Sequence, residues 1–426
     1  MVIFSHPIIL QKCVLPRLIC HTPSKQFSPR QAKGAVASIR VLTDTVVAVY
    51  ADMSVGIYKF TPSTRDSRRP FFFKADRHRL LARRDLNMSR TSIKHAPAVQ
   101  TSTQSTGTPF LVGSWSFAVT LGGATTENIR RRIHTSARLT AANDVTKEAE
   151  ATAYLLSCGY WDDTVKIHSL DGMRLLFSDF GGHQGPILCL SMGTDGALMV
   201  TGGQDATCRV WVVDHFDMAL ALCDGYTQTA LGVPNGIGSL LKLCHILWGH
   251  AHPVSCLDMS SELDVVVSGD LGGLLCVHTI RRGEFIRSII PNSKFSDCSV
   301  KKVALEGNGT FAVHMADQSL HVYTVNGIHL CSLNAEEGLH DIRICSGGEM
   351  LVSGGDKGQL VIRLMKDLSI QSILDLSTHG PIRCISLTPD DLNPIPQYMF
   401  IGSDDGLITV VSEDPNAENE LVVFRS

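Results

Sequence analysis

The side chains of this chain that could carry chemistry are its 17 histidines and 13 cysteines, because these residue types bind transition metals and act as catalytic bases and nucleophiles. Their spacing fits neither role. The cysteines occur singly, without a Cys-x-x-Cys pair, and the sequence contains no P-loop, no His-Glu-x-x-His and no Gly-x-Ser-x-Gly motif. We therefore predict a protein that is not an enzyme, has reduced and buried thiols, and uses no cofactor, metal ion or small-molecule substrate.

The elements that position these side chains belong to a repeat. An apolar run, a polar turn and a second alternating run recur seven times; the copies end at Tyr58, His168, Trp211, His278, Tyr323, Arg363 and Val411. The intervals between these end points are 110, 43, 67, 45, 40 and 48 residues, and four of the six lie near the roughly 40 to 45 residues of a four-stranded propeller blade. Asp stands six residues before five of the end points, as a tight hairpin turn favours.

Composition supports many short strands rather than helices. Hydrophobic residues make up 44% and charged residues 19%, with 36 glycines, which is typical of strands joined by tight turns. We predict an all-β propeller, with seven blades and long disordered insertions in the N-terminal third. The expected boundaries are a segment at 1–37 that could supply a closing strand, a propeller at 38–412 with inserts at 61–108, 122–151 and 215–243, and a tail or alternative closing strand at 413–426.

One copy of the repeat resembles a WD-repeat blade. Gly182-His183, Thr201, Asp205 and Trp211 are similar to the Gly-His, Ser/Thr, Asp and Trp residues whose side chains form a hydrogen-bonded brace in that family. The resemblance implies a structural brace of His183, Thr201, Asp205 and Trp211.

The next repeat keeps only part of this pattern. His250 and Ser268 have the same eighteen-residue spacing, but Gly272 stands in place of the Asp and His278 in place of the Trp. We expect this brace to be broken or rebuilt. The histidines at such equivalent places, including His168, are predicted to be buried hydrogen-bond partners rather than metal ligands.

Two longer strings narrow the resemblance. WGHAHPVSCLDMSSELDVVVSGDLGGLLCVHTIRRGEFIRSI (248–289) and LLSCGYWDDTVKIHSLDG (155–172) resemble the C-terminal WD-repeat propeller of neurobeachin-like BEACH-domain proteins. No counterpart of the BEACH module is found in this sequence, so we expect either a short relative or a fragment. The resemblance implies a scaffold in vesicle or membrane trafficking.

In WD propellers, the residue before the turn Asp projects onto the face most used for partners. Here these residues are Ala51, Trp161, Gln204, Leu271, Ala316, Asp356 and Asp404. We select Trp161, Gln204, Leu271, Asp356 and Asp404 as the candidate partner-binding face, with Trp161 as its anchor because Trp is enriched at binding hot spots. Packing of Trp161 against its own turn is the alternative.

The charge distribution suggests a second surface. Residues 1–140 hold 21 Lys and Arg against 6 Asp and Glu, a net charge of +15, whereas the remainder holds 17 against 35, or −18. Within the insert at 61–108, Arg68, Arg69, Arg83 and Arg84 are candidates for contact with an anionic membrane surface, where each contributes on the order of 1 kcal/mol. A solvated disordered loop is the alternative.

We therefore expect a cytoplasmic, non-catalytic scaffold that binds other proteins. The alternative is an adaptor on a membrane or nucleic-acid surface that acts through the basic inserts, with nucleic acid the less favoured of the two. Salt dependence separates these readings, because phosphate binding weakens steeply with salt.

Overall fold

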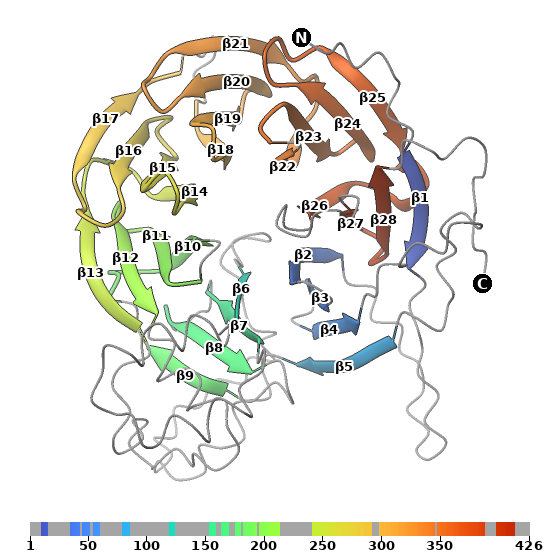
Figure 1. Ribbon diagram of the computed structural model, residues 1–426, viewed down its shortest axis with the longest axis horizontal. Coiled ribbons are helices and arrows are strands. Elements are labelled where there is room, and N and C mark those ends of the chain that lie inside the picture. Colours follow the sequence, from blue (N-terminus) through green and yellow to red (C-terminus); the bar gives the residue numbers. More distant parts are fainter. Residues whose placement is uncertain are drawn as a thin grey trace, which may run out of the picture. The chain divides into compact units, whose positions relative to one another are not determined.

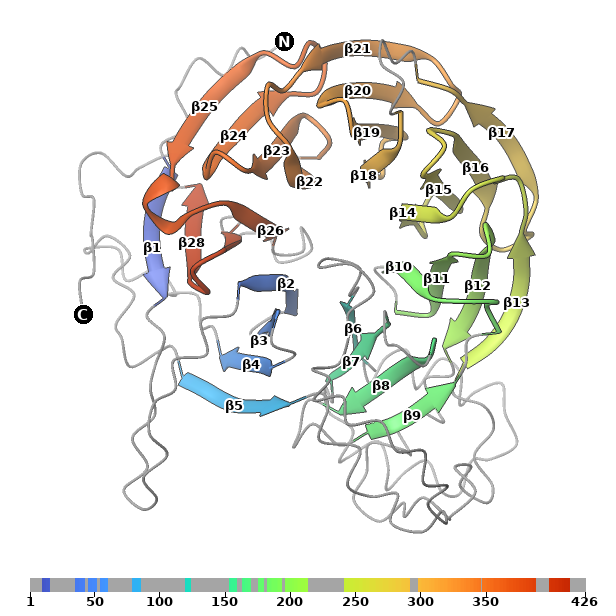
Figure 2. The same ribbon diagram turned by 180° about the vertical axis from the view of Figure 1, so that it is seen from behind.

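The computed structural model describes residues 10–15, 35–42, 45–51, 54–59, 79–85, 119–123, 153–158, 163–169, 175–179, 182–193, 196–213, 241–291, 298–345, 347–387 and 398–413 (Figures 1 and 2). The chain divides into two compact units, one of Leu86–Ile290 and one of Met1–Asp85 with Pro291–Ser426. Over the described ranges the regular structure is β-strand, apart from one three-residue 3-10 helix, η3 (Ser377–His379). The all-β prediction is confirmed.

The unit of Leu86–Ile290 contains three four-stranded sheets among its described residues. Their strands, in chain order, are β6 (Val119–Gly123), β7 (Ala153–Ser157), β8 (Val165–Ser169) and β9 (Leu175–Asp179); β10 (Ile187–Met192), β11 (Leu198–Gly203), β12 (Cys208–Val213) and β13 (Leu241–Leu247); and β14 (Val254–Ser260), β15 (Val265–Asp270), β16 (Leu275–Thr279) and β17 (Phe285–Ile289). Within each of these sheets, every strand pairs antiparallel with the next one in the chain.

The other unit contains four such sheets in the described part of the chain. Three follow chain order: β2 (Val36–Leu42), β3 (Thr45–Tyr50), β4 (Ser54–Lys59) and β5 (Arg79–Asp85); β18 (Val300–Leu305), β19 (Thr310–Met315), β20 (Ser319–Thr324) and β21 (His329–Asn334); and β22 (Leu339–Cys345), β23 (Met350–Gly355), β24 (Gln359–Leu364) and β25 (Ile370–Asp375). The fourth joins β26 (Ile382–Leu387), β27 (Tyr398–Ser403) and β28 (Ile408–Glu413) to β1 (Leu10–Leu15), so the N-terminal segment supplies its fourth strand.

The seven end points of the sequence repeat fall on one structural position. Each lies in the third strand of its sheet. Trp211, His278 and Arg363 each pair with the residue twelve positions earlier, whereas His168 pairs with Leu155, thirteen positions earlier. The repeat read from the sequence is therefore the second and third strand of each sheet.

Neighbouring sheets within a unit pack through apolar side chains. Cys208, Val210 and Val254 belong to one buried cluster that joins β10–β13 to β14–β17. Close packing explains the glycine that stands near the end of several second strands: a Cβ on Gly202 would lie 2.7 Å from Val254. In the other unit, a Cβ on Gly402 would lie 2.6 Å from Val36, so the next sheet approaches too closely for any side chain.

The expected insert at 61–108 differs from the structure. Strand β5 lies inside that range and pairs along its whole length with β4 as the fourth strand of its sheet. Strand β5 is the outermost strand of its sheet and has three arginines. It therefore lacks the alternation of apolar and polar residues by which a strand is predicted from sequence. The other two expected inserts also overlap strands slightly, since β6 ends at Gly123 and β13 begins at Leu241.

Candidate functional site

The sheet β10–β13 contains a continuous chain of hydrogen bonds between the four predicted brace residues. Trp211 Nε1 donates to Thr201 Oγ1 at 3.0 Å. Thr201 Oγ1 lies 2.9 Å from His183 Nε2, and His183 Nδ1 lies 3.0 Å from Asp205 Oδ1. These hydrogen bonds connect the loop before β10, the second strand β11, the turn after it and the third strand β12.

Only one protonation state satisfies every group in this brace. Thr201 accepts from Trp211, so its own hydroxyl hydrogen is available to His183 Nε2, and neutral His183 then donates from Nδ1 to Asp205. Burial lowers the pKa of His183 below its usual value, although Asp205 opposes the shift. Burial alone would raise the pKa of Asp205, but hydrogen bonds from the Gln184 backbone, His183 and Thr207 outweigh it and lower that pKa to about 2.

The next sheet rebuilds the brace with a residue that sequence reasoning missed. His250 Nδ1 lies 3.0 Å from Asp270 Oδ2, and His250 Nε2 lies 2.8 Å from Ser268 Oγ. Asp270 also accepts from the backbone N–H groups of Gly272 and Leu274 at 2.9 Å. The repeat pattern places this carboxylate at position 272, where the chain has Gly. In the structure it is Asp270, the last residue of the second strand, β15, that supplies the carboxylate.

The residue in the Trp211 position differs from sheet to sheet. In β14–β17 it is His278, whose Nε2 donates to the Trp248 carbonyl at 2.8 Å instead of to the brace serine. In β22–β25 it is Arg363, which is buried and donates from Nη1 to Ser353 Oγ at 2.7 Å. A Ser/Thr hydroxyl therefore accepts from indole in one sheet and from guanidinium in another.

The predicted partner-binding residues share one backbone contact. Gln204 N–H donates to the Pro186 carbonyl, Leu271 to Pro253, Asp356 to Gly338 and Asp404 to Pro381, at 2.9 to 3.1 Å. In each case the acceptor directly precedes the first strand of the same sheet. The contact fixes the turn while its side chain remains exposed at all four predicted positions. Trp161, the expected anchor, lies outside the described residues.

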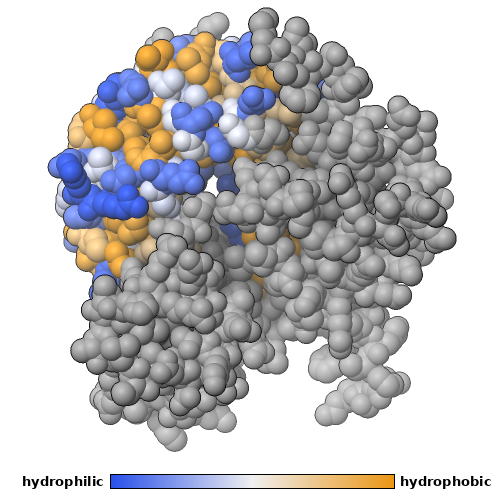
Figure 3. Space-filling view, viewed as in Figure 1, coloured by the Kyte–Doolittle hydropathy of each residue, from blue (hydrophilic) through white to orange (hydrophobic). Residues whose placement is uncertain are grey.

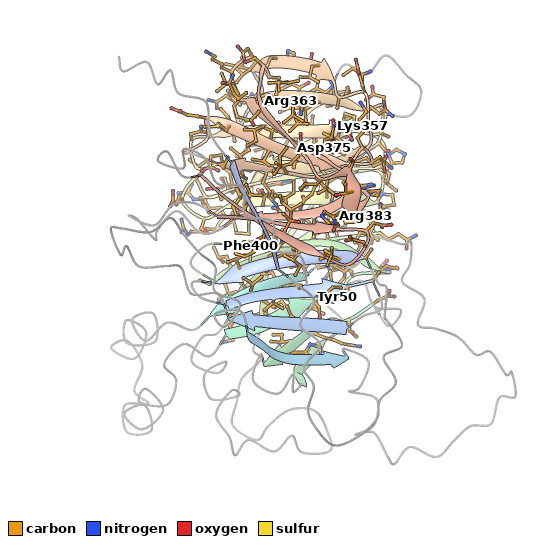
Figure 4. The ribbon with its side chains drawn as sticks, turned by 90° about the vertical axis from the view of Figure 1, so that its right-hand side faces the viewer. Tyr50, Lys357, Arg363, Asp375, Arg383 and Phe400 are labelled. Atoms are coloured by element: carbon orange, nitrogen blue, oxygen red, sulfur yellow. The ribbon has the colours of Figure 1, made fainter. Side chains whose placement is uncertain are left out.

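Two of these turn residues are joined across neighbouring sheets. Arg383 on β26 donates from Nε to Asp404 at 2.8 Å, and its Nη1 lies 2.9 Å from His340 Nε2. His340, on β22, lies 2.8 Å from Asp356 Oδ1 through that same Nε2. We call Asp356, His340, Arg383 and Asp404 the turn network. In the side view of Figure 4, Arg383 and Lys357, which follows Asp356, lie toward the same side of this unit.

The turn network cannot satisfy all of its contacts at once. His340 Nε2 either accepts from Arg383 or donates to Asp356, because one ring nitrogen carries either a lone pair or a hydrogen. The side chains of Asp356 and Asp404 are 59% and 44% exposed, so both carboxylates remain open to a partner. His340 and Arg383 were missed from the sequence because their pairing spans 43 residues and depends on register between sheets.

Of the four arginines predicted to contact a membrane, two lie among the described residues. Arg68 and Arg69 lie outside the described residues. Arg83 and Arg84 lie on β5, opposite Gly56 and Val55 of β4.

The described residues offer no cluster of three or more His, Cys, Asp or Glu that could hold a metal ion. Buried thiols recur along the first and third strands, and burial raises the pKa of Cys208, Cys276 and Cys384 to about 12. Such thiols remain protonated at neutral pH and are poor nucleophiles. Within the same part of the chain, none of the helical structure is long and apolar enough to cross a bilayer.

Comparison with known proteins identifies the family. A profile described as the neurobeachin beta propeller domain matches residues 92–418, more than half of the chain. The chain belongs to the neurobeachin β-propeller family. The neurobeachin-like resemblance seen in the two sequence strings is thereby confirmed, and so is the prediction of a β-propeller.

Individual relatives of this propeller chain are much longer proteins. BEACH domain-containing protein B of Arabidopsis thaliana is 32% identical over 218 residues, which cover 51% of this chain and 8% of that protein. BEACH domain-containing protein lvsE of Dictyostelium discoideum is 26% identical over 277 residues, covering 61% of this chain and 11% of that protein. The chain therefore spans about a tenth of the length of these relatives.

Proposed function

We propose that this chain is a non-catalytic scaffold whose turn network binds a protein partner, and that the seven sheets of its described residues are the blades of one propeller. The observation that carries the proposal is the turn network, which presents two exposed carboxylates on turns fixed by backbone hydrogen bonds. Rigid support matters because binding to a preorganised surface avoids the cost of ordering it. The blade count is supported by the shared register of six third strands and by the equivalent position of the seventh, whose register differs by one residue.

We place this scaffold in vesicle or membrane trafficking because the chain resembles neurobeachin-like proteins, and relatives are named for the BEACH domain. A cytoplasmic location stays a prediction and rests on the free cysteines of the described residues.

Site-specific photocrosslinking tests the turn network. A photoreactive phenylalanine analogue at position 356 or 404 should yield a defined protein adduct in cells, whereas the same analogue at Gln371, exposed on β25, should not. With the analogue at position 356, Asp404→Lys reverses the charge beside it and should weaken the adduct, and Asp356→Lys should do the same for the analogue at position 404. Gln371→Lys is the matched control and should leave it intact.

The outcome against the proposal is equally specific. If these variants retain every adduct, and the double variant Asp356→Lys with Asp404→Lys retains every co-purifying protein, the turn network is not the binding site. If neutralising Arg68, Arg69, Arg83 and Arg84 instead releases the protein from anionic liposomes and from its partners, the function resides in the basic segment.

A further inference from the structure

A second exposed surface lies where the end of β13 contacts the turn between β16 and β17. Trp248 directly follows β13 and is 67% exposed; Phe285 begins β17 and is 53% exposed. Exposed aromatic side chains are rare on a solvated surface, and they are the residues in which interfaces concentrate binding energy. We call Trp248, Phe285, Arg281 and Arg282 the Trp248 patch.

The two aromatic residues are held by the same buried histidine. His278 Nε2 donates to the Trp248 carbonyl at 2.8 Å, and its ring meets Phe285 edge to face at 5.3 Å between centroids. Gly249 packs between them with φ of +145°, and a Cβ there would lie 3.2 Å from Cys276 Sγ and 3.5 Å from the Phe285 ring. The backbone that presents both rings is therefore fixed before any partner arrives.

The turn between β16 and β17 brings basic side chains to the same place. His245 on β13 donates from Nε2 to the Arg281 carbonyl at 2.8 Å. Gly283 in that turn packs directly on the His245 ring, since a Cβ would lie 2.7 Å from it. Strand β13 and the Arg281-Arg282 turn thus form one continuous surface within this unit.

The charge of this surface is positive. Over residues 241–248 and 281–291 the basic residues are Lys242, Arg281, Arg282 and Arg287, against Glu284 alone, which gives 4 − 1 = +3. Asp264 from the neighbouring turn lies 3.9 Å from Arg281, while Arg282 is exposed. Figure 3 shows hydrophobic and strongly hydrophilic residues side by side on the coloured surface where Figure 1 draws β16 and β17.

We propose that the Trp248 patch binds an extended protein segment in which apolar side chains alternate with carboxylates. Aromatic rings on a fixed backbone suit apolar side chains, and the arginine turn suits flanking Asp or Glu. An extended segment fits because, among the described residues, β13 and β17 are each the outermost strand of their sheet, and the outermost strand of a sheet can receive another strand. This surface shares no residue with the turn network, so its test does not depend on the proposed function.

The test uses the full chain and a fluorescein-labelled ten-residue peptide of alternating Glu and Leu with one central Phe. The control peptide carries Lys in place of each Glu. Fluorescence anisotropy should show saturable binding of the Glu peptide and at least about 10-fold weaker binding of the Lys peptide. Trp248→Ala should weaken Glu-peptide binding at least about 10-fold, because the exposed anchor is lost. Arg281→Glu with Arg282→Glu should weaken it further and reduce its salt dependence.

Matched variants separate this patch from general surface effects. Ile370→Ala removes a 54% exposed apolar side chain on β25 and should change binding less than about 2-fold. Asp356→Lys with Asp404→Lys should also leave peptide binding unchanged. Equal binding of the Glu and Lys peptides, or unchanged binding by Trp248→Ala, would overturn the proposal. Binding to vesicles of anionic phospholipid that Trp248→Ala abolishes, without peptide binding, would also overturn it in favour of a lipid surface.

Discussion

Replacing Asp205 by Ala is the sharpest test of the brace, because this carboxylate serves three separate parts of the sheet. Its Oδ1 contacts His183 Nδ1 at 3.0 Å and accepts from Thr207 Oγ1 at 2.8 Å, while Oδ2 accepts from the Gln184 N–H at 3.0 Å. Asp317 occupies the same place in β18–β21 and accepts from the N–H and Oγ of Ser319, two residues away. The two aspartates therefore differ in what they hold together.

The expected loss follows from this difference. Asp205→Ala leaves the buried His183 donor without its acceptor, which costs about 1 to 3 kcal/mol, and removes the Thr207 bond, worth about 1 kcal/mol. We expect a total near 3 kcal/mol. Asp317→Ala loses a local turn contact and should cost about 1 kcal/mol. At roughly 2 to 4 °C per kcal/mol for domains of 150 to 250 residues, the melting temperatures should differ by several degrees.

Differential scanning calorimetry of both variants measures the difference, and hydrogen exchange locates it. Exchange should accelerate in β10–β13 for Asp205→Ala and in β18–β21 for Asp317→Ala. Asp205→Asn keeps an acceptor oxygen and should fall between wild type and Asp205→Ala. Equal losses for the two alanine variants would refute the brace as the source of stability.

Three further predictions follow from the same contacts. Asp270→Ala should destabilise the protein about as much as Asp205→Ala, because Asp270 is fully buried and accepts from His250, Gly272 and Leu274. Urea unfolding measures the change in the free energy of unfolding. A decrease below about 1 kcal/mol would show that Asp270 does not replace the missing turn aspartate. Burial lowers the pKa of His314 to about 4, below its unfolded value near 6.5, so the stability that neutral His314 contributes is complete above pH 6.5 and is lost as the pH falls toward 4. Neutral His314 accepts at Nε2 from the Leu339 N–H at 3.1 Å, and His314→Gln should therefore reduce the fall of the urea midpoint between pH 7 and 5. An unchanged pH dependence in this variant would contradict the prediction. Deleting residues 61–108 removes β5 and should lower both β content by circular dichroism and melting temperature, whereas deleting 87–117 spares β5 and β6; equal behaviour of the two deletions would mean that β5 contributes nothing.

The sequence was sufficient to predict the parts of the fold that repeat at fixed spacing. The turn aspartates and the bulky third-strand residues recur because each turn needs an acceptor for its own backbone, and Asp205, Asp317 and Asp405 all accept from the N–H two residues later. Four brace residues could be named in advance because local geometry places them eighteen, four and six residues apart.

Contacts whose spacing is not fixed could not be predicted in this way. Asp270 substitutes for a turn aspartate from a position two residues earlier, so a search at constant offset passes over it. The turn network joins His340 to Arg383 through the packing of two sheets, and no local pattern encodes that register. Such contacts are visible only when the sheets are placed side by side.

The fourth strands explain why the sequence reveals the scaffold more clearly than its binding surfaces. Strands β21 and β25 alternate between exposed and half-buried residues, whereas β15 is buried throughout. A strand paired on one side has few packing demands on its side chains, so it can carry arginines in β5 and an exposed Phe285 in β17 without loss of the fold. The same freedom removes the apolar alternation by which strands are recognised. The outermost strands can therefore carry exposed residues, such as Phe285, that the repeat of the second and third strands does not predict.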